Sequence, residues 1–300
     1  MLNEHFGWLG SEQERKARES LVKTRVLGFK DAKPEIEWYT KFWTYDHIWN
    51  QERRVLGRVI PAYKQEVGDC VSFGMKQAGE CAQIREIASG RQEEVFREWF
   101  APWIYAVSRN QIGGGLSGDG SLGAWAAEAV NTYGVLFSDD QGVPSYSGSL
   151  ARKWGSRSNV SSPEYAKFFD VASDNTVAIA ELKSVDEIRW CLSRGLTVTI
   201  ASSRGFRMSP VSHKGYHVFV PSGTWMHQMC FVAYDEDIDA FYRMNSWGPS
   251  VHGEPLRGEK PGGAWNLAKD VEDELRTRSA EVYALYNFAG SQGDRDFNIV

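Results

Sequence analysis

Residues 65–74 read QEVGDCVSFG, and Cys70 within this stretch marks the start of the most apolar helix that the sequence predicts. Gly68 and Asp69 do not continue a helix readily, whereas apolar residues recur at helical spacing from there to Ser89. A cysteine in the first turn of a helix lies close to orphan backbone N–H groups and to the positive end of the helix dipole. Because both stabilise a thiolate, we expect the pKa of Cys70 to lie well below its free value near 8.5.

Composition and charge exclude several classes of protein. The chain has 300 residues, of which 42% are hydrophobic and 24% charged, with a formal net charge of −5. This acidic balance argues against nucleic acid as a partner, and no apolar run approaches the roughly 18–20 residues that span a bilayer. Four scattered cysteines without a CxxC pair predict neither a disulfide framework nor a zinc site. Because neither a secretion signal nor a membrane-spanning segment is visible, we expect a soluble, cytoplasmic protein, with secretion by another route or association with a virion left open. We expect neither a metal nor a cofactor.

Helical patterns predominate in the first half of the chain and strand patterns in the second. Beside the helix that starts at Cys70, helices are predicted at residues 11–23, 93–107, 124–133 and 184–194. β-Branched and aromatic runs of strand length follow at residues 177–182, 196–201, 227–234, 240–245 and 281–287, and the polar stretch 203–223 is predicted to be a loop. Helices followed by strands indicate an α+β fold with two segregated halves.

Two later residues form a candidate catalytic group with Cys70. His227 begins an apolar strand in GTWMHQMCFVAYDE, and Asn245 ends the next strand in YRMNSWG. In an antiparallel pair the start of one strand lies beside the end of the next, so these two side chains should be neighbours. Taken singly, the histidine is more often a core residue and the asparagine a strand-ending turn residue. Together with a cysteine, an amide that orients an imidazole suits nucleophilic catalysis.

Three blocks of the sequence resemble the papain-like cysteine peptidases. They are residues 65–74, residues 118–146 (GDGSLGAWAAEAVNTYGVLFSDDQGVPSY) and residues 225–248, which end in the specific match NSWG. The resemblance implies a two-lobed α+β fold, with a helical left lobe, a right lobe made of a β-sheet or barrel, and the active-site cleft between them. The lobes would cover about 61–160 and 161–290. Residues 1–60 would form an N-terminal extension, either propeptide-like or embracing the fold, and residues 291–300 a polar tail.

The resemblance also implies a role for each residue of the candidate site. Cys70 would be the nucleophile, His227 the general base and then the acid for the leaving amine, and Asn245 the residue that orients His227. Trp247 would pack over the hydrogen bond between His227 and Asn245 and keep water away from it. The thiolate would attack a carbonyl carbon and form a thioester.

Two parts of the implied site depart from the family's pattern. The oxyanion would be held by the backbone N–H of the nucleophile and by an upstream side chain, and Gln65 lies one residue closer to Cys70 than the family's glutamine does. Gln65 is the favoured donor, with Lys64 as the alternative. The substrate-binding glycine loop would comprise Gly118, Gly120 and Ser121, although two adjacent glycines are expected there. Pairing with an extended peptide is still predicted, because a glycine permits close backbone approach.

Other histidines and cysteines receive simpler interpretations. His213 and His217 fall in the polar stretch 203–223 and are predicted to be solvated loop residues, with a lid or specificity element over the cleft as the alternative. The remaining histidines, His5, His47 and His252, have no catalytic context. Cys81 and Cys230 are predicted to be core residues.

The sequence predicts a thiol protease, a hydrolase that cleaves peptide or isopeptide bonds of a peptide or protein substrate. Two alternatives remain open. The same thioester would serve an acyl transferase or a cell-wall amidase, or the fold would serve as a structural or binding subunit whose site has lost activity. The sequence does not indicate an oligomeric state.

Overall fold

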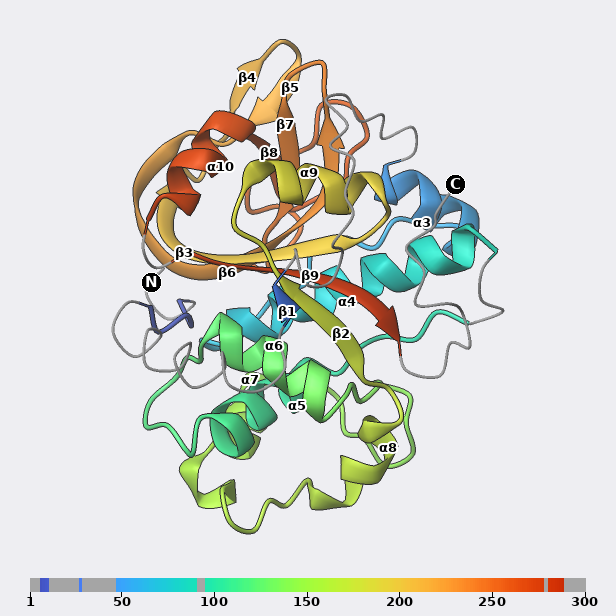
Figure 1. Ribbon diagram of the computed structural model, residues 1–300, viewed down its shortest axis with the longest axis vertical. Coiled ribbons are helices and arrows are strands. Elements are labelled where there is room, and N and C mark those ends of the chain that lie inside the picture. The colour runs from blue at the N-terminus through green and yellow to red at the C-terminus, as the bar shows by residue number, and fades with distance from the viewer. Residues whose placement is uncertain (1–5, 11–26, 29–46, 91–94, 278–279, 289–300) are drawn as a thin grey trace.

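The computed structural model describes residues 6–10, 27–28, 47–90, 95–277 and 280–288, and Figure 1 shows their arrangement. The predicted helix at residues 11–23, His5 and the polar tail lie outside the described residues. The helices in the described part are α3 (Ile48–Leu56), α4 (Cys70–Ala88), α5 (Ala101–Val107), α6 (Gly123–Thr132), α7 (Gly148–Trp154), α8 (Phe169–Ser173), α9 (Val185–Ser193) and α10 (Ala268–Leu275). Short turns add a π-helix, η2 (Ser108–Ile112), and two 3-10 helices, η3 (Arg157–Asn159) and η4 (Ala166–Phe168).

One mixed sheet has nine strands, eight of them from the second half of the chain, in the order β1-β2-β9-β3-β6-β7-β8-β5-β4. The pairs are antiparallel except β1 with β2 and β5 with β8. The strands are β1 (Leu27–Gly28), β2 (Val177–Glu181), β3 (Thr197–Phe206), β4 (Val211–His213), β5 (Tyr216–Val218), β6 (Pro221–Asp235), β7 (Ala240–Met244), β8 (Gly263–Leu267) and β9 (Glu281–Phe288).

Helix α4 is the centre of the fold and joins the helical half to the sheet half. Sixteen of its 19 residues are buried, and it packs against β6 and β3 on one side and α5 and α6 on another. Gly79 lets Trp99 lie directly on the helix, because a Cβ at this glycine would come within 2.1 Å of the Trp99 ring. A helix that is buried on all sides needs apolar residues around its whole circumference and not along one face only.

The sheet is covered on both faces, as the period of two along β6 requires. Cys230 and Val232 belong to the large core shared with α4, α5 and α6. Phe231, which points to the opposite face, packs in a second core with α9 and α10. In Figure 1 the helices α5, α6, α7 and α8 lie below α4, whereas α9, α10 and most of the strands lie above it. Cys81 and Cys230 are both buried, which confirms their assignment to the core.

The predicted α+β class is confirmed, but two predicted segments are wrong. Of the helix predicted at residues 93–107, residues 95–100 are not helical, and α5 begins only at Ala101 with Pro102 in its first turn. The stretch 203–223 is not a loop, because β3 continues to Phe206 and β4 pairs with β5. Lys214 and Gly215 between them both have positive φ, as two-residue hairpin turns require. In the described part of the chain, no helix combines the length and the apolar character needed to cross a bilayer.

Candidate active site

Cys70 is the first residue of α4 and is completely buried. Burial raises the pKa of its thiol to about 12, although backbone N–H groups of Gln228 and Gly7 act in the opposite direction. The expectation of a lowered pKa is therefore wrong for the state that the structure describes. Taking a thiolate out of water costs more here than the nearby N–H groups recover.

His227 and Asn245 are neighbours, which confirms the prediction from antiparallel pairing. Strand β6 pairs with β7, Cys230 lies opposite Met244, and Asn245 follows at the end of β7. The Nε2 atom of His227 lies 2.8 Å from Oδ1 of Asn245. The Trp247 ring lies 4.6 Å from the His227 ring, measured between centroids, at an interplanar angle of 33°. Both His227 and Asn245 are buried.

The two candidate oxyanion donors occupy different environments. Gln65 is buried, its backbone N–H donates to the Ser246 carbonyl at 2.8 Å, and its Oε1 accepts the Ser246 hydroxyl. Its Nε2 donates to the Val67 carbonyl at 2.8 Å. Lys64 is exposed, and its backbone forms a bridge with Trp247. Of the two side chains, that of Gln65 is buried and bonded to Ser246, next to Asn245, whereas Lys64 is exposed.

The glycine loop is held by an arginine that the sequence analysis did not single out. Arg109 lies on the π-helical turn η2 and is buried. Its guanidinium donates to the carbonyls of Gly120, Gly118, Leu116 and Gly155. Because four loop carbonyls converge on one cation, the loop keeps a fixed shape. Only the position of Arg109 just before the glycine-rich stretch hinted at this role.

Residues Phe6–Gly10, here named the N-terminal strap, bridge the helical and the sheet halves at the candidate site. Ser121 N–H donates to the Gly7 carbonyl at 2.6 Å, and Leu9 N–H donates to the Ser121 carbonyl at 2.9 Å. On the other side, Trp8 N–H donates to the Met226 carbonyl at 3.2 Å. The strap therefore forms a parallel bridge with the glycine loop while it also contacts the strand that carries His227.

The side chain of Trp8 anchors the strap in the protein. It is buried, and its indole N–H donates to the Glu281 carboxylate at 2.6 Å. The same carboxylate accepts the backbone N–H groups of Gly123 and Ala124 at the start of α6. Trp8 thus adds a donor to a carboxylate that already caps a helix.

The strap also covers Cys70. A Cβ on Gly7 would lie 2.0 Å from the carbonyl oxygen of Gly68, so only glycine fits at this crossing. The Phe6 ring lies 6.4 Å from the His227 ring and 5.6 Å from the Trp247 ring, measured between centroids. Of the three residues predicted to bind substrate backbone, Gly120 and Ser121 touch the strap, while Gly118 is exposed.

One histidine without a predicted catalytic context lies at the site after all. His252 is buried, and its Nε2 lies 3.0 Å from Nδ2 of Asn245. The prediction failed because His252 lies in the long loop between β7 and β8, where no periodicity points to a contact. His213 is exposed on β4 and His217 is half-buried on β5.

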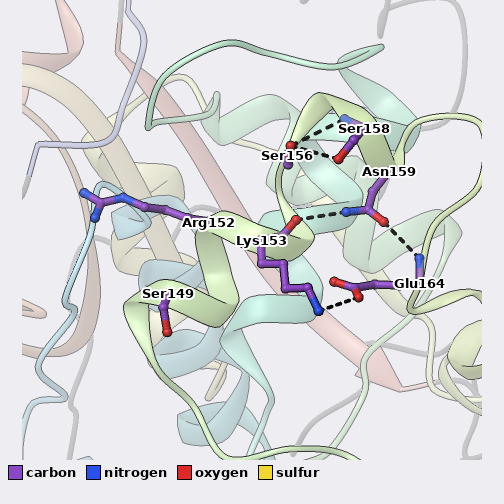
Figure 2. A pocket seen from close by; sticks show the side chains of 7 residues that line it. All are labelled: Ser149, Arg152, Lys153, Ser156, Ser158, Asn159 and Glu164. Atoms are coloured by element: carbon purple, nitrogen blue, oxygen red, sulfur yellow. Dashed lines mark hydrogen bonds and ion pairs between the residues drawn. The ribbon is translucent and has the colours of Figure 1, made fainter.

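A separate open pocket lies around α7, and none of the catalytic candidates lines it (Figure 2). Its lining residues are Ser149, Arg152, Lys153, Ser156, Ser158, Asn159 and Glu164. Lys153 pairs with Glu164 at 2.7 Å, and Arg152 pairs with Asp119 beside the glycine loop. Among the described residues, no three histidine, cysteine or acidic side chains are grouped to hold a metal ion.

Comparison with known proteins identifies the fold. No family model and no curated protein matches the sequence. The structure is similar to xylellain, a cysteine protease from Xylella fastidiosa, with 15% identity over 95% of this chain and 96% of that one, and a TM-score of 0.58. It is also similar to the cysteine protease and lectin-like domains of Cwp84, a surface layer associated protein of Clostridium difficile. That match has 14% identity over 94% of this chain and 60% of that one, and a TM-score of 0.52. The chain has the fold of the papain-like cysteine proteases.

Proposed function

We propose that this protein is a cysteine peptidase that hydrolyses peptide or isopeptide bonds through a thioester on Cys70. The observation that carries the proposal is the hydrogen bond of 2.8 Å between His227 and Asn245. It lies under Trp247, and the residue after His227 directs its backbone N–H at the buried thiol. A histidine that an amide orients suits the activation of a thiol, and here it would act on the cysteine at the start of α4.

The hydrogen bonds support the proton positions that the reaction needs. Ser246 N–H donates to Oδ1 of Asn245 at 2.7 Å, so this amide oxygen is an acceptor and Nε2 of His227 carries a hydrogen. In the neutral ring Nδ1 then holds the lone pair and takes the proton of the Cys70 thiol. The thiolate attacks the substrate carbonyl carbon, and the imidazolium returns the proton to the leaving amine. Water then hydrolyses the thioester.

The oxyanion would be held by the backbone N–H of Cys70 and by Gln65. An amide nitrogen carries two hydrogens, so Nε2 of Gln65 can donate to the oxyanion while it also donates to the Val67 carbonyl. The Ser246 hydroxyl and the Ser246 carbonyl hold the Gln65 residue at its side chain and its backbone. A preorganised donor of this kind stabilises the tetrahedral intermediate without reorganisation.

The strap supports a peptide as the substrate and implies a closed resting state. An extended stretch of five residues is bound through backbone hydrogen bonds on both sides, by Ser121 and by Met226. A substrate that takes the same path would have its backbone beside Cys70. The strap must leave first, because Cys70 and His227 are buried beneath it. We propose that residues 6–10 keep the enzyme inactive until they are displaced or removed.

A labelling experiment tests the proposal. In protein from which the strap has been removed or displaced, a peptide that carries a thiol-reactive electrophile should modify Cys70. A fluorogenic peptide library should be cleaved by that protein but not by its Cys70→Ala variant. Cys81→Ala is the matched control, because Cys81 is equally buried on the same helix and should leave both signals unchanged. Modification at another cysteine would remove Cys70 from its role. A reactive Cys70 without cleavage would favour acyl transfer, which an added amine acceptor would reveal, and an inert Cys70 in strap-free protein would indicate a binding subunit.

A further inference from the structure

Asn245 lies between two histidines, of which only His227 has a place in the proposed reaction. His252 contacts the amide from the opposite side, where its Nε2 lies 3.0 Å from Nδ2 of Asn245. The other ring nitrogen, Nδ1, lies 2.8 Å from the Met208 carbonyl. Both nitrogens of a fully buried imidazole are thus engaged, one of them with the residue that orients the general base.

Donor and acceptor chemistry fixes the protonation of this second histidine. A carbonyl oxygen only accepts, so Nδ1 of His252 carries a hydrogen and donates it to Met208. The amide nitrogen of Asn245 only donates, so Nε2 of His252 is the unprotonated acceptor. The orientation of that amide is fixed independently, because Ser246 N–H donates to Oδ1. A continuous chain therefore runs from His227 through Asn245 and His252 to the Met208 carbonyl.

We propose that His252 is a positioning residue of the active site, which holds the Asn245 amide in the orientation that presents Oδ1 to His227. The proposal rests on the proposed function, since it concerns the orientation of the general base. Ser246 N–H defines where the amide oxygen lies, and His252 defines where the amide nitrogen lies. Without His252, the buried Nδ2 of Asn245 would lose this acceptor, and rotation of the amide would take Oδ1 away from the imidazole.

The surroundings of His252 keep the ring neutral. The ring of Phe219 meets it edge-on at 4.7 Å between centroids, and Trp225 lies parallel to it at 6.3 Å. Burial lowers the pKa of His252 to about 4, and the Met208 carbonyl acts against that shift. No charged side chain of the described residues contributes, and His227, across Asn245, is the titratable group that faces it through this chain. Nε2 therefore stays an acceptor at every pH above about 4.

Substitutions at His252 separate its hydrogen bonding from its packing. In His252→Gln the side-chain oxygen replaces Nε2 as acceptor and the side-chain amide replaces Nδ1–H as donor, without a titrating ring. In His252→Phe both bonds are lost while the ring is kept. Phe219→Leu is the matched control, because it loosens the same cluster without touching Asn245.

The first readout is nitrogen NMR of histidine-labelled full-length protein, which needs no substrate. In the wild type we expect His252 to carry its proton on Nδ1 and to remain neutral down to about pH 4. His227 should carry a hydrogen on Nε2, and its titration should shift in His252→Phe but not in His252→Gln or Phe219→Leu. A His252 protonated on Nε2, or an unchanged His227 titration in His252→Phe, overturns the proposal. If one variant does not fold, the tautomer of His252 in the wild type still tests the proposal, because a hydrogen on Nε2 would contradict it.

The second readout is the pH profile of peptide cleavage or of Cys70 labelling, measured for every variant in protein from which the strap has been removed or displaced. We expect His252→Phe to lower kcat/KM between about tenfold and about 10²-fold through kcat, as misorientation of a catalytic group does, and to move the acid limb of the profile. His252→Gln should keep kcat/KM near the wild-type value. If His252→Phe and Phe219→Leu lower kcat/KM equally and neither shifts the pH profile, His252 contributes only packing and the proposal is wrong. If no peptide is cleaved at all, the peptidase assignment fails, whereas the NMR result still decides the role of His252.

Discussion

Substituting Gly7 by alanine should open the active site, because the strap crosses Gly68 where there is no room for a side chain. The added Cβ would lie 2.0 Å from the Gly68 carbonyl oxygen and 2.3 Å from its carbon, whereas ordinary contacts are 3.4–4 Å. The obstacle is backbone next to the N-cap of α4, so it cannot rotate away as a side chain would. The strap must move, and its bonds to Ser121 and Met226 cannot all survive such a displacement.

The size of the effect follows from the cost of overpacking. Forcing an extra methyl group into a packed site costs about 1–3 kcal/mol. If this cost falls on the closed state alone, the ratio of open to closed molecules rises by about fivefold to about 150-fold. Cys70 reacts only when open, so its rate of alkylation should rise by the same factor. Burial no longer raises the thiol pKa in open molecules, so labelling should also extend to lower pH.

The assay is pseudo-first-order alkylation with iodoacetamide, followed by peptide mapping that assigns the label to Cys70. Gly79→Ala is the matched control, because its Cβ would come as close as 2.1 Å to the Trp99 ring, on a part of α4 remote from the strap. This control should lower the melting temperature without accelerating the reaction. The reasoning is refuted if Gly7→Ala reacts no faster than Gly79→Ala, or if wild-type Cys70 already reacts at the rate of a free thiol.

Two further predictions concern the residues that flank the nucleophile. Burial raises the pKa of Asp69 to about 8, so the folded state binds the proton of this carboxyl more tightly than the unfolded chain does. The contribution of this proton to the free energy of unfolding is complete below about pH 4. It is lost as the pH rises through about 8, at up to about 1.4 kcal/mol per pH unit. Urea unfolding at pH 5 and pH 8 should show this loss in the wild type and not in Asp69→Asn, and equal slopes would contradict the assignment. Gln65→Ala, measured in the Gly7→Ala background, should lower kcat/KM by about 10²–10³-fold through loss of an oxyanion donor. Lys64 is exposed, so Lys64→Ala in the same background should change kcat/KM little. The reverse pattern would assign the oxyanion donor to Lys64.

The parts of the site that the sequence predicted depend on local rules. Helix α4 begins at Cys70 because Gly68 and Asp69 interrupt the helical pattern just before a long apolar stretch. His227 and Asn245 meet because β6 and β7 are consecutive antiparallel strands, although β6 begins at Pro221 and His227 therefore lies inside the strand and not at its predicted start. Each inference needs only a short window of sequence and one geometric rule, which is why both were accessible.

The parts that the sequence did not predict depend on contacts between distant segments. Residues 6–10 form a short stretch without periodicity, and their partners Ser121 and Met226 lie more than 100 residues away. His252 is reached through a loop, whose path no pattern specifies. The predicted direction of the pKa shift of Cys70 was wrong for the same reason. The helix start was visible in the sequence, whereas the strap that excludes water from it was not.

Burial acts in opposite ways on the two ends of the site. It raises the pKa of Cys70 and lowers that of His252, since in each case the uncharged form is favoured. The segments that bury the two side chains differ in whether they can leave the site. Cys70 is covered by the strap, whose departure would hydrate the thiol, whereas His252 is enclosed by Phe219, Trp225 and the Met208 carbonyl, none of which belongs to the strap. Displacement of the strap should therefore expose Cys70 to water and lower its pKa, while the chain of hydrogen bonds from His227 to Met208 stays in place. Activation would then require exposure of the active site and no rearrangement of its residues.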